Sequence, residues 1–239
     1  TIGLIAISFT MFVMLSFIFM QMLHFQLVRD MSPFSAALKA LPLPLALLPA
    51  ATSSDKLVAR FGRQNVIATG ILLIACGLLL FSLIEIDTNY WYIAATFVLI
   101  GGGMGLTMAP STTAVMDSVP ESKAGVGSAT NDASREVGGA LGIAVGGSVL
   151  NQIYQSSINI PDSALGQSDM IESSFPSAIN VGKQMIADGN SEGAELIASA
   201  KEAFLDGMIA ACLVAACVAI IAALIVKWKL PNDDYFSEE

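Results

Sequence analysis

Long apolar runs without charge constrain the fold of this chain more than any other feature of its sequence. Residues 2–25 contain no charged side chain, and the runs at 65–84, 90–116 and 207–226 are equally free of charge. A helix rises 1.5 Å per residue, so about 20 apolar residues cross the hydrocarbon core of a bilayer, which is about 30 Å thick. Each of these runs therefore predicts a transmembrane helix.

Two further segments are long enough to span a bilayer but contain ionisable side chains. Residues 33–52 include Lys39, and residues 126–150 include a charged cluster that is described below. Only 13% of the chain is charged and 54% is hydrophobic, whereas a soluble domain is about 25% charged. The excess apolar surface must face lipid. The sequence therefore predicts an all-α integral membrane protein with six transmembrane helices, whose surroundings are the lipid bilayer.

Basic residues in the short loops predict the orientation. The segment 53–64 holds Lys56, Arg60 and Arg63 against one acid, which is typical of a cytoplasmic loop. Alternation along the chain then places Lys123 in the next cytoplasmic loop. The predicted organisation is five spans in residues 1–150, a long extracytoplasmic loop in 151–203, the last span in 204–228 and a cytoplasmic acidic tail in 229–239.

The long loop has a helical pattern of its own. Apolar residues recur at helical spacing in 177–187 and in 192–204, and the turn-forming sequence Asp188-Gly189-Asn190 separates the two segments. A short helical hairpin and a solvated linker both fit this pattern, and the two interpretations remain open at this point.

The chain lacks the motifs of an enzyme or a nucleic-acid-binding protein. No nucleophile–base pair, zinc-protease motif or nucleotide-binding motif can be assembled, the cysteines show no metal-ligand spacing, and no basic stripe with interleaved aromatic residues exists. The glycine run at 101–105 lies inside a predicted span, where close helix packing explains it better than a phosphate loop. The single histidine, His24, falls at the end of the first span. An interfacial side chain is favoured there over a proton relay.

Ionisable side chains inside the fifth span are the strongest functional signal. Asn131, Asp132, Arg135 and Glu136 occupy neighbouring positions on one helix, and Asp132 can reach Arg135 at i+3. One arginine can neutralise one carboxylate and leave the other free to titrate, so we predict a site for proton and substrate coupling. A structural salt bridge near the cytoplasm is the alternative.

The same predicted helix continues with a stripe of small residues. Gly138, Gly139, Gly142 and Gly146 fall at spacings that allow a neighbouring helix to approach closely. We therefore predict helix packing along these glycines.

Four sequence blocks together resemble a known family. They are Asp30 to Ala37 followed by Leu41-Pro42, the loop Arg60-Phe61-Gly62-Arg63, the run 101–106 with Ala109-Pro110, and residues 123–144, which form the most specific block. The chain resembles the second half of the fourteen-span drug:proton antiporters of the major facilitator superfamily, the QacA/EmrB type. Two positions depart from the family pattern, because Ala37 replaces a usual glycine and Ala59 replaces the aspartate of the stronger loop copy.

The resemblance carries expectations about architecture and function. It implies that the six helices form the C-terminal bundle of a major-facilitator fold, equivalent to spans nine to fourteen, and that the N-terminal half of the same transporter is missing. It implies multi-pass location in the cell membrane and exchange of protons for drug-like compounds, with the proton gradient as the driving force and no cofactor or metal. Arg60, Gly62 and Arg63 match the second copy of a conformational loop, and Asp132 occupies a position where some members use a carboxylate.

Other functions remain open from the sequence. An exporter or permease for a dedicated metabolite, amino acid or lipid would have the same composition, and so would a membrane scaffold that transports nothing. The chain begins at Thr1 within an apolar stretch, and we interpret it as part of a longer protein.

Overall fold

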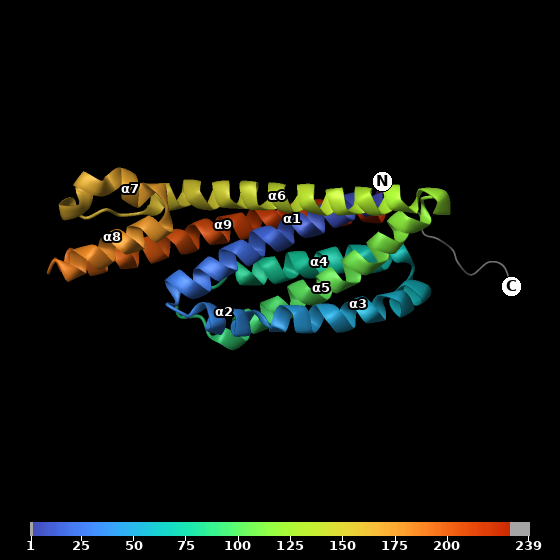
Figure 1. The fold of residues 1–239 in the computed structure, drawn as a ribbon. Helices are drawn as coiled ribbons and strands as arrows, with labels where there is room; N and C mark the ends of the chain where they lie inside the picture. Colours follow the sequence, from blue (N-terminus) through green and yellow to red (C-terminus); the bar gives the residue numbers. More distant parts are fainter. Residues whose placement is uncertain (1, 230–239) are drawn as a thin grey trace.

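The computed structural model describes residues 2–229, and every regular element in this part of the chain is a helix (Figure 1). Apart from Lys229, the predicted acidic tail lies outside the described residues. Six helical segments are long and apolar enough to cross a membrane. These observations confirm the predicted all-α fold with six membrane-length helices.

Short connections join the first five segments along the chain, and a longer segment that is described below leads to the sixth. They are α1 (Ile2–Leu23) continued by the π-helical turn η1 (His24–Val28), α2 (Pro33–Ala40) continued by α3 (Pro42–Phe61), α4 (Arg63–Phe81), α5 (Tyr90–Asp117), the 3-10 turn η2 (Glu121–Lys123) continued by α6 (Ala124–Ser157), and α9 (Glu192–Lys229).

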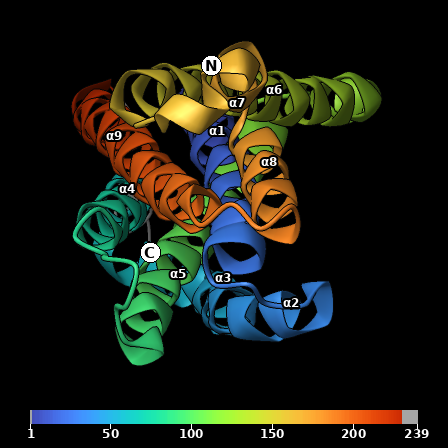
Figure 2. The ribbon, with the colours of Figure 1, turned by 90° about the vertical axis from the view of Figure 1, so that its left-hand side faces the viewer.

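The helices α1 and α5 connect the rest of the bundle. Helix α1 packs against α5, α6 and α9, and helix α5 also packs against α3 and α4 (Figure 2). Phe17 of α1 contacts Phe81 of α4 and Phe97 of α5 edge to face, with ring centroids 4.9 Å and 5.5 Å apart. All three rings are buried, so this aromatic cluster fixes α1, α4 and α5 relative to one another.

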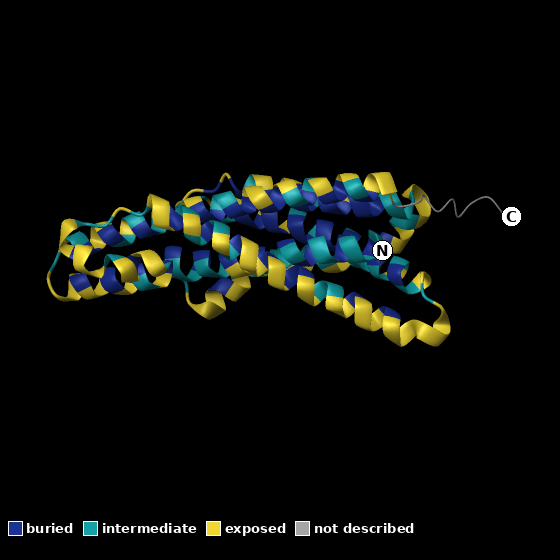
Figure 3. Cartoon of the chain, turned by 90° about the horizontal axis from the view of Figure 1, so that it is seen from above, coloured by how far each residue is buried: buried dark blue, intermediate teal, exposed yellow. Residues whose placement is uncertain are grey.

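Prolines divide the second predicted span into α2 and α3. Pro42 and Pro44 have no backbone N–H, so they cannot donate the helical hydrogen bonds expected at those positions. The N–H of Leu41 instead donates to the carbonyl oxygen of Leu38, at 3.3 Å. The longer part, α3, lies at the edge of the bundle and is largely exposed, and Figure 3 shows such exposed residues along the outer faces of the helices.

A single glycine joins α3 to α4. Gly62 has φ of 82°, which lies in the left-handed region that residues with a Cβ rarely adopt. The Gly62 N–H donates to the carbonyl oxygen of Val58 and closes α3. This conformation explains why the loop between the two helices needs only one residue.

The helices α6 and α9 extend well beyond their predicted spans. The fifth span was expected to end at residue 150 and the last to begin at 204, but α6 continues to Ser157 and α9 begins at Glu192. The 38 residues of α9 would measure about 57 Å, far more than a bilayer core. No proline interrupts either extension, so each helix continues without a break.

The segment between α6 and α9 forms a compact helical cap. It contains the 3-10 turn η3 (Asp162–Gln167), α7 (Ser168–Ser173) and α8 (Phe175–Ala187), which packs along the first part of α9 at one end of the bundle (Figure 1). Phe175 stacks on Phe204, with ring centroids 4.4 Å apart, and the Tyr154 hydroxyl donates to the carbonyl oxygen of Ile171 at 3.1 Å. The two arms of the hairpin pattern are thus helical, and the second arm is the start of α9.

Candidate transport site

The two acids of the charged cluster lie on an open face of α6. Asp132 and Glu136 are both exposed and occupy positions i and i+4, which share one face of a helix. Asn131 lies on the packed side and is 6% exposed. The site therefore presents two carboxylates away from the helices of this bundle.

Arg135 does not form the ion pair that its spacing predicts. Among residues 2–229, no salt bridge within 4.0 Å connects its guanidinium to Asp132 or Glu136. Its Nη2 instead donates to the Thr112 hydroxyl of α5, at 3.1 Å. The side chain is half-buried and turned toward the packed side of α6, so the neighbouring helix supplies the acceptor, and neither carboxylate has a cationic partner in the part of the chain that the structure describes.

Buried polar atoms without partners surround this contact. The Nε of Arg135, the Oδ1 of Asn131 and the Oγ of Ser111 have no hydrogen-bond partner within the described part of the chain. Ser111 is fully buried and precedes Thr112 on α5, so it lies at about the same depth as Arg135. Sequence reasoning missed both α5 hydroxyls. The polar run Ser111-Thr112-Thr113 inside an apolar span was the signal that could have indicated them.

The glycine stripe of α6 lies against α1. A Cβ on Gly138 or Gly142 would overlap with a backbone carbonyl of α1, and a Cβ on Gly139 or Gly146 would overlap with an α1 side chain. The backbones of the two helices are therefore as close as glycine allows. This contact fixes the position of Asp132 and Glu136 relative to α1.

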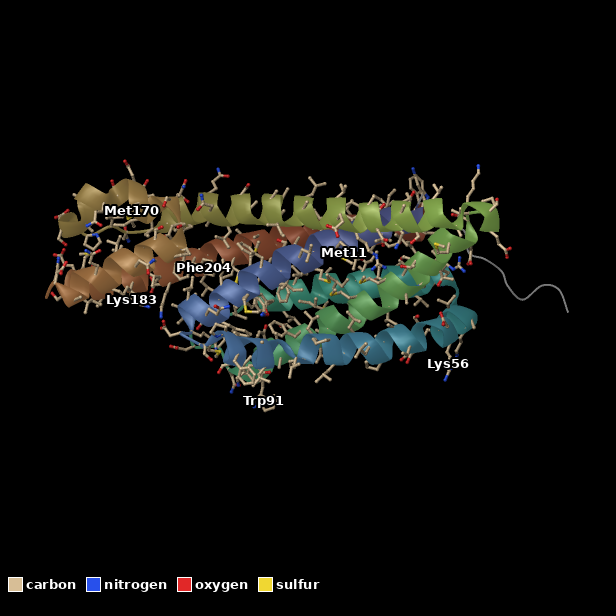
Figure 4. The ribbon with its side chains drawn as sticks, in the orientation of Figure 1. Met11, Lys56, Trp91, Met170, Lys183 and Phe204 are labelled. Carbon is tan, nitrogen blue, oxygen red and sulfur yellow. The ribbon has the colours of Figure 1, made fainter. Side chains whose placement is uncertain are left out.

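The basic loop lies at one end of the bundle, next to the end of α5. Arg63 Nη2 pairs with Asp117 Oδ2 at 2.9 Å and so connects the start of α4 to the end of α5. The Arg60 guanidinium lies 5.3 Å from the ring centroid of Phe61. Figure 4 shows Lys56 at this end of the molecule and Lys183 of α8 at the opposite end.

Six membrane-length helices with ionisable side chains inside one of them are typical of a polytopic transporter. The family model described as Major Facilitator Superfamily matches residues 2–143. This match covers more than half of the chain, so the chain belongs to the major facilitator superfamily, a superfamily of transporters and not of enzymes.

Several curated relatives are drug-resistance or export proteins. The multidrug efflux pump LfrA of Mycolicibacterium smegmatis is 28% identical over 89% of this chain and 42% of its own length. The multidrug resistance protein Stp of Mycobacterium tuberculosis is 29% identical over 87% of this chain and 40% of its own. The tetracenomycin C resistance and export protein of Streptomyces glaucescens is 32% identical over 51% of this chain and 23% of its own. The chain thus spans about two fifths of the length of the first two relatives.

Proposed function

We propose that the chain is the C-terminal half of a proton-coupled multidrug efflux transporter in the cell membrane. It exchanges protons for amphipathic, mainly cationic compounds. The efflux and resistance functions of relatives that match most of this chain support the proposal, as does the partial coverage of their length. The resemblance to the fourteen-span family adds the expectation of an N-terminal half with eight spans.

The open carboxylates of α6 are the observation that carries this proposal. An unpaired carboxylate inside a membrane span is costly in contact with lipid, so the face with Asp132 and Glu136 must meet water or protein. Two carboxylates without a cation can accept a proton or a positively charged substrate, and the two ligands then compete for one site. This competition is the property that an antiporter requires.

The uncovered faces of α3 and α6 are where we expect the proposed second half to pack. The helix α3 packs on α5 and has Ser54 as its single buried residue, and it leaves Leu45 at 65% and Leu48 at 61% exposure; α6 leaves its carboxylates open. A second bundle against α3 and α6 would enclose a central path for substrate, as in transporters built from two repeats. The end of α3 and the start of α4 hold Arg60, Gly62 and Arg63. A change in packing between the two halves at this point would alter the Arg63–Asp117 ion pair.

Substitution of the two acids in the full-length carrier tests the proposal. Asp132→Asn keeps the shape of the side chain but cannot ionise, so we expect it to abolish export of the fluorescent cation ethidium. Glu136→Gln removes one of the two acidic groups and leaves Asp132 in place, so we expect it to retain export with a changed pH profile. Asp169→Asn, an exposed acid in α7 of the cap, is the matched control and should export normally. Ethidium accumulation in cells at several external pH values is the measurement.

Two results would contradict the proposal in different ways. Unchanged export and pH profile in Asp132→Asn would make the acids structural. Absence of ethidium export by the unmodified carrier, with normal amounts in the membrane, would favour an exporter for a dedicated substrate.

A further inference from the structure

The turn after the first membrane helix has an unusual backbone. Residues His24–Val28 form a π-helix, and the Arg29 N–H donates to the His24 carbonyl oxygen five residues before it, at 3.1 Å. π-helical turns are rare in proteins, and those that occur often lie at functional sites. The widening also brings the side chains of His24 and Arg29 together.

His24 is fully buried and takes part in this contact as an acceptor. Its side chain is 0% exposed, and its Nε2 accepts a hydrogen bond from the Nε of Arg29 at 3.2 Å. An imidazole that accepts at Nε2 is neutral and carries its proton on Nδ1. The Nδ1 atom has no partner among residues 2–229, so this histidine is buried with one nitrogen unsatisfied.

Arg29 and Asp30 attach this turn to two other parts of the molecule. Arg29 Nη2 donates to the Thr88 carbonyl oxygen between α4 and α5, at 2.6 Å, and Asp30 pairs with Lys201 of α9 at 2.7 Å. The three contacts His24–Arg29, Arg29–Thr88 and Asp30–Lys201 are together called the η1 latch below. The latch holds the end of the first span against two segments that are distant in sequence.

The charged groups around the latch can be named. The Arg29 guanidinium is the charged neighbour that acts directly on the imidazole, and the Asp87 carboxylate acts on Arg29. Burial lowers the pKa of Arg29 from its ordinary value and Asp87 opposes this shift, so Arg29 stays a cation at physiological pH. The elements α9 and α2 also contact η1. Lys201 of α9 is paired with Asp30, and the Lys39 ammonium of α2 lies over the Tyr90 ring.

We propose that His24 is a proton-binding site whose protonation opens the η1 latch. A protonated imidazole has two N–H donors, so its Nε2–H would point at the Nε–H of Arg29 and the hydrogen bond would be lost. It would also place a second cation, on the fully buried imidazole, beside the half-buried guanidinium of Arg29. The proton therefore binds when the turn has opened and His24 is hydrated, and binding holds the turn open.

Linkage gives the sign and size of the effect. The latched state holds neutral His24, whereas a hydrated histidine has a pKa near 6.5, so acid favours the open state. If only the open state binds the proton, the ratio of open to latched molecules rises about tenfold between about pH 7.5 and 5.5. The proposal concerns a conformational equilibrium, so it does not depend on drug export or on the role of Asp132.

Cysteine labelling in the purified full-length carrier tests this inference. Val28 lies in η1 and is 3% exposed, and Val28→Cys in a background without other cysteines reports opening of the turn. Ser173→Cys on the exposed surface of α7 is the reference, and the ratio of the two maleimide rates removes the pH dependence of the thiol reaction. In detergent the pH acts on both faces, so the result is independent of membrane orientation. We expect the ratio to rise about tenfold between about pH 7.5 and 5.5.

Two variants identify the group that titrates. His24→Gln keeps an acceptor oxygen for Arg29 but does not titrate, so its rate ratio should stay low at both pH values. Arg29→Gln removes the charged donor and should raise the ratio at both. A pH-independent ratio in the parent carrier would overturn the proposal, and so would an undiminished tenfold response in His24→Gln. If His24→Gln does not fold, Arg29→Gln is the deciding variant. The proposal would be overturned if Arg29→Gln showed the same low ratio at about pH 7.5 and the same pH response as the parent carrier.

Discussion

At the scale of single residues, the position of Arg135 shows how a partner is selected. The sequence places two carboxylates three residues before and one residue after Arg135 on the same helix. The structure shows its guanidinium bound instead to the Thr112 hydroxyl of α5. Asp132 and Glu136 are on the exposed side of α6, whereas Arg135 is half-buried beside α5. The arrangement of helices therefore separates charges that the spacing alone would pair.

The hydroxyl of Thr112 is expected to stabilise the bundle through Arg135. Thr112→Val keeps the shape but removes the acceptor, which leaves a partly buried guanidinium without it and should cost about 1–3 kcal/mol. Thr113→Val is the matched control, because Thr113 is exposed and its hydroxyl donates only to the Ala109 carbonyl oxygen of its own helix. Thermal unfolding of the purified full-length carrier measures both. Equal midpoints for the two variants would show that the Arg135–Thr112 bond contributes nothing.

At the scale of elements, backbone contact between α1 and α6 determines where the candidate site lies. In lipid, hydrophobic burial does not drive helices together, so close packing and small residues contribute more to helix association. The α6 glycines that face α1 leave no room for a side chain at several successive turns. The long helix α6 then holds the open carboxylates at one part of its length and reaches the cap with the other.

Alanine substitutions can separate contact from helix propensity in α6. A Cβ at Gly142 would overlap with the Phe12 carbonyl, so Gly142→Ala should push α6 from α1 and destabilise the carrier by about 1–3 kcal/mol. At Gly147 a Cβ would meet nothing within 4 Å, so Gly147→Ala should be neutral or stabilise by up to about 1 kcal/mol through helix propensity. Thermal unfolding midpoints decide, and the reverse order of the two variants would contradict the packing argument.

At the scale of the whole molecule, the two ends of the bundle differ in character. One end carries the basic loop with Lys56, and the other carries the cap of α7, α8 and the start of α9 (Figure 4). Basic short loops are typical of the cytoplasmic side. The cap is therefore expected on the extracytoplasmic side.

Labelling of single cysteines in intact cells tests this orientation. Ser53 and Ser173 are both exposed, whereas Ser54 is buried and unsuitable. With other cysteines removed from the full-length carrier, an impermeant maleimide should label Ser173→Cys and should label Ser53→Cys only after the cells are opened. Labelling of position 53 alone in intact cells would reverse the topology.

The class of fold follows from the sequence, because runs of span length and apolar composition leave little alternative to a membrane helix. The six spans and the presence of acids in the fifth span could both be predicted from local pattern, whereas the positive φ of Gly62 is seen only in the structure. Helix ends could not, because residues 151–157 and 192–203 are too polar to be assigned to a membrane span and yet contain no helix-breaking proline.

Which side chains meet depends on how the helices pack in three dimensions. Thr112 and Arg135 are 23 residues apart, and Asp30 and Lys201 are 171 apart, so no local spacing could indicate either contact. The burial of His24 likewise depends on the π-helical turn and on neighbouring helices, while its position at the end of an apolar run indicated only an interface. The sequence pattern predicts which helices contact lipid. The packing of helices from distant parts of the chain determines the partner of each polar group.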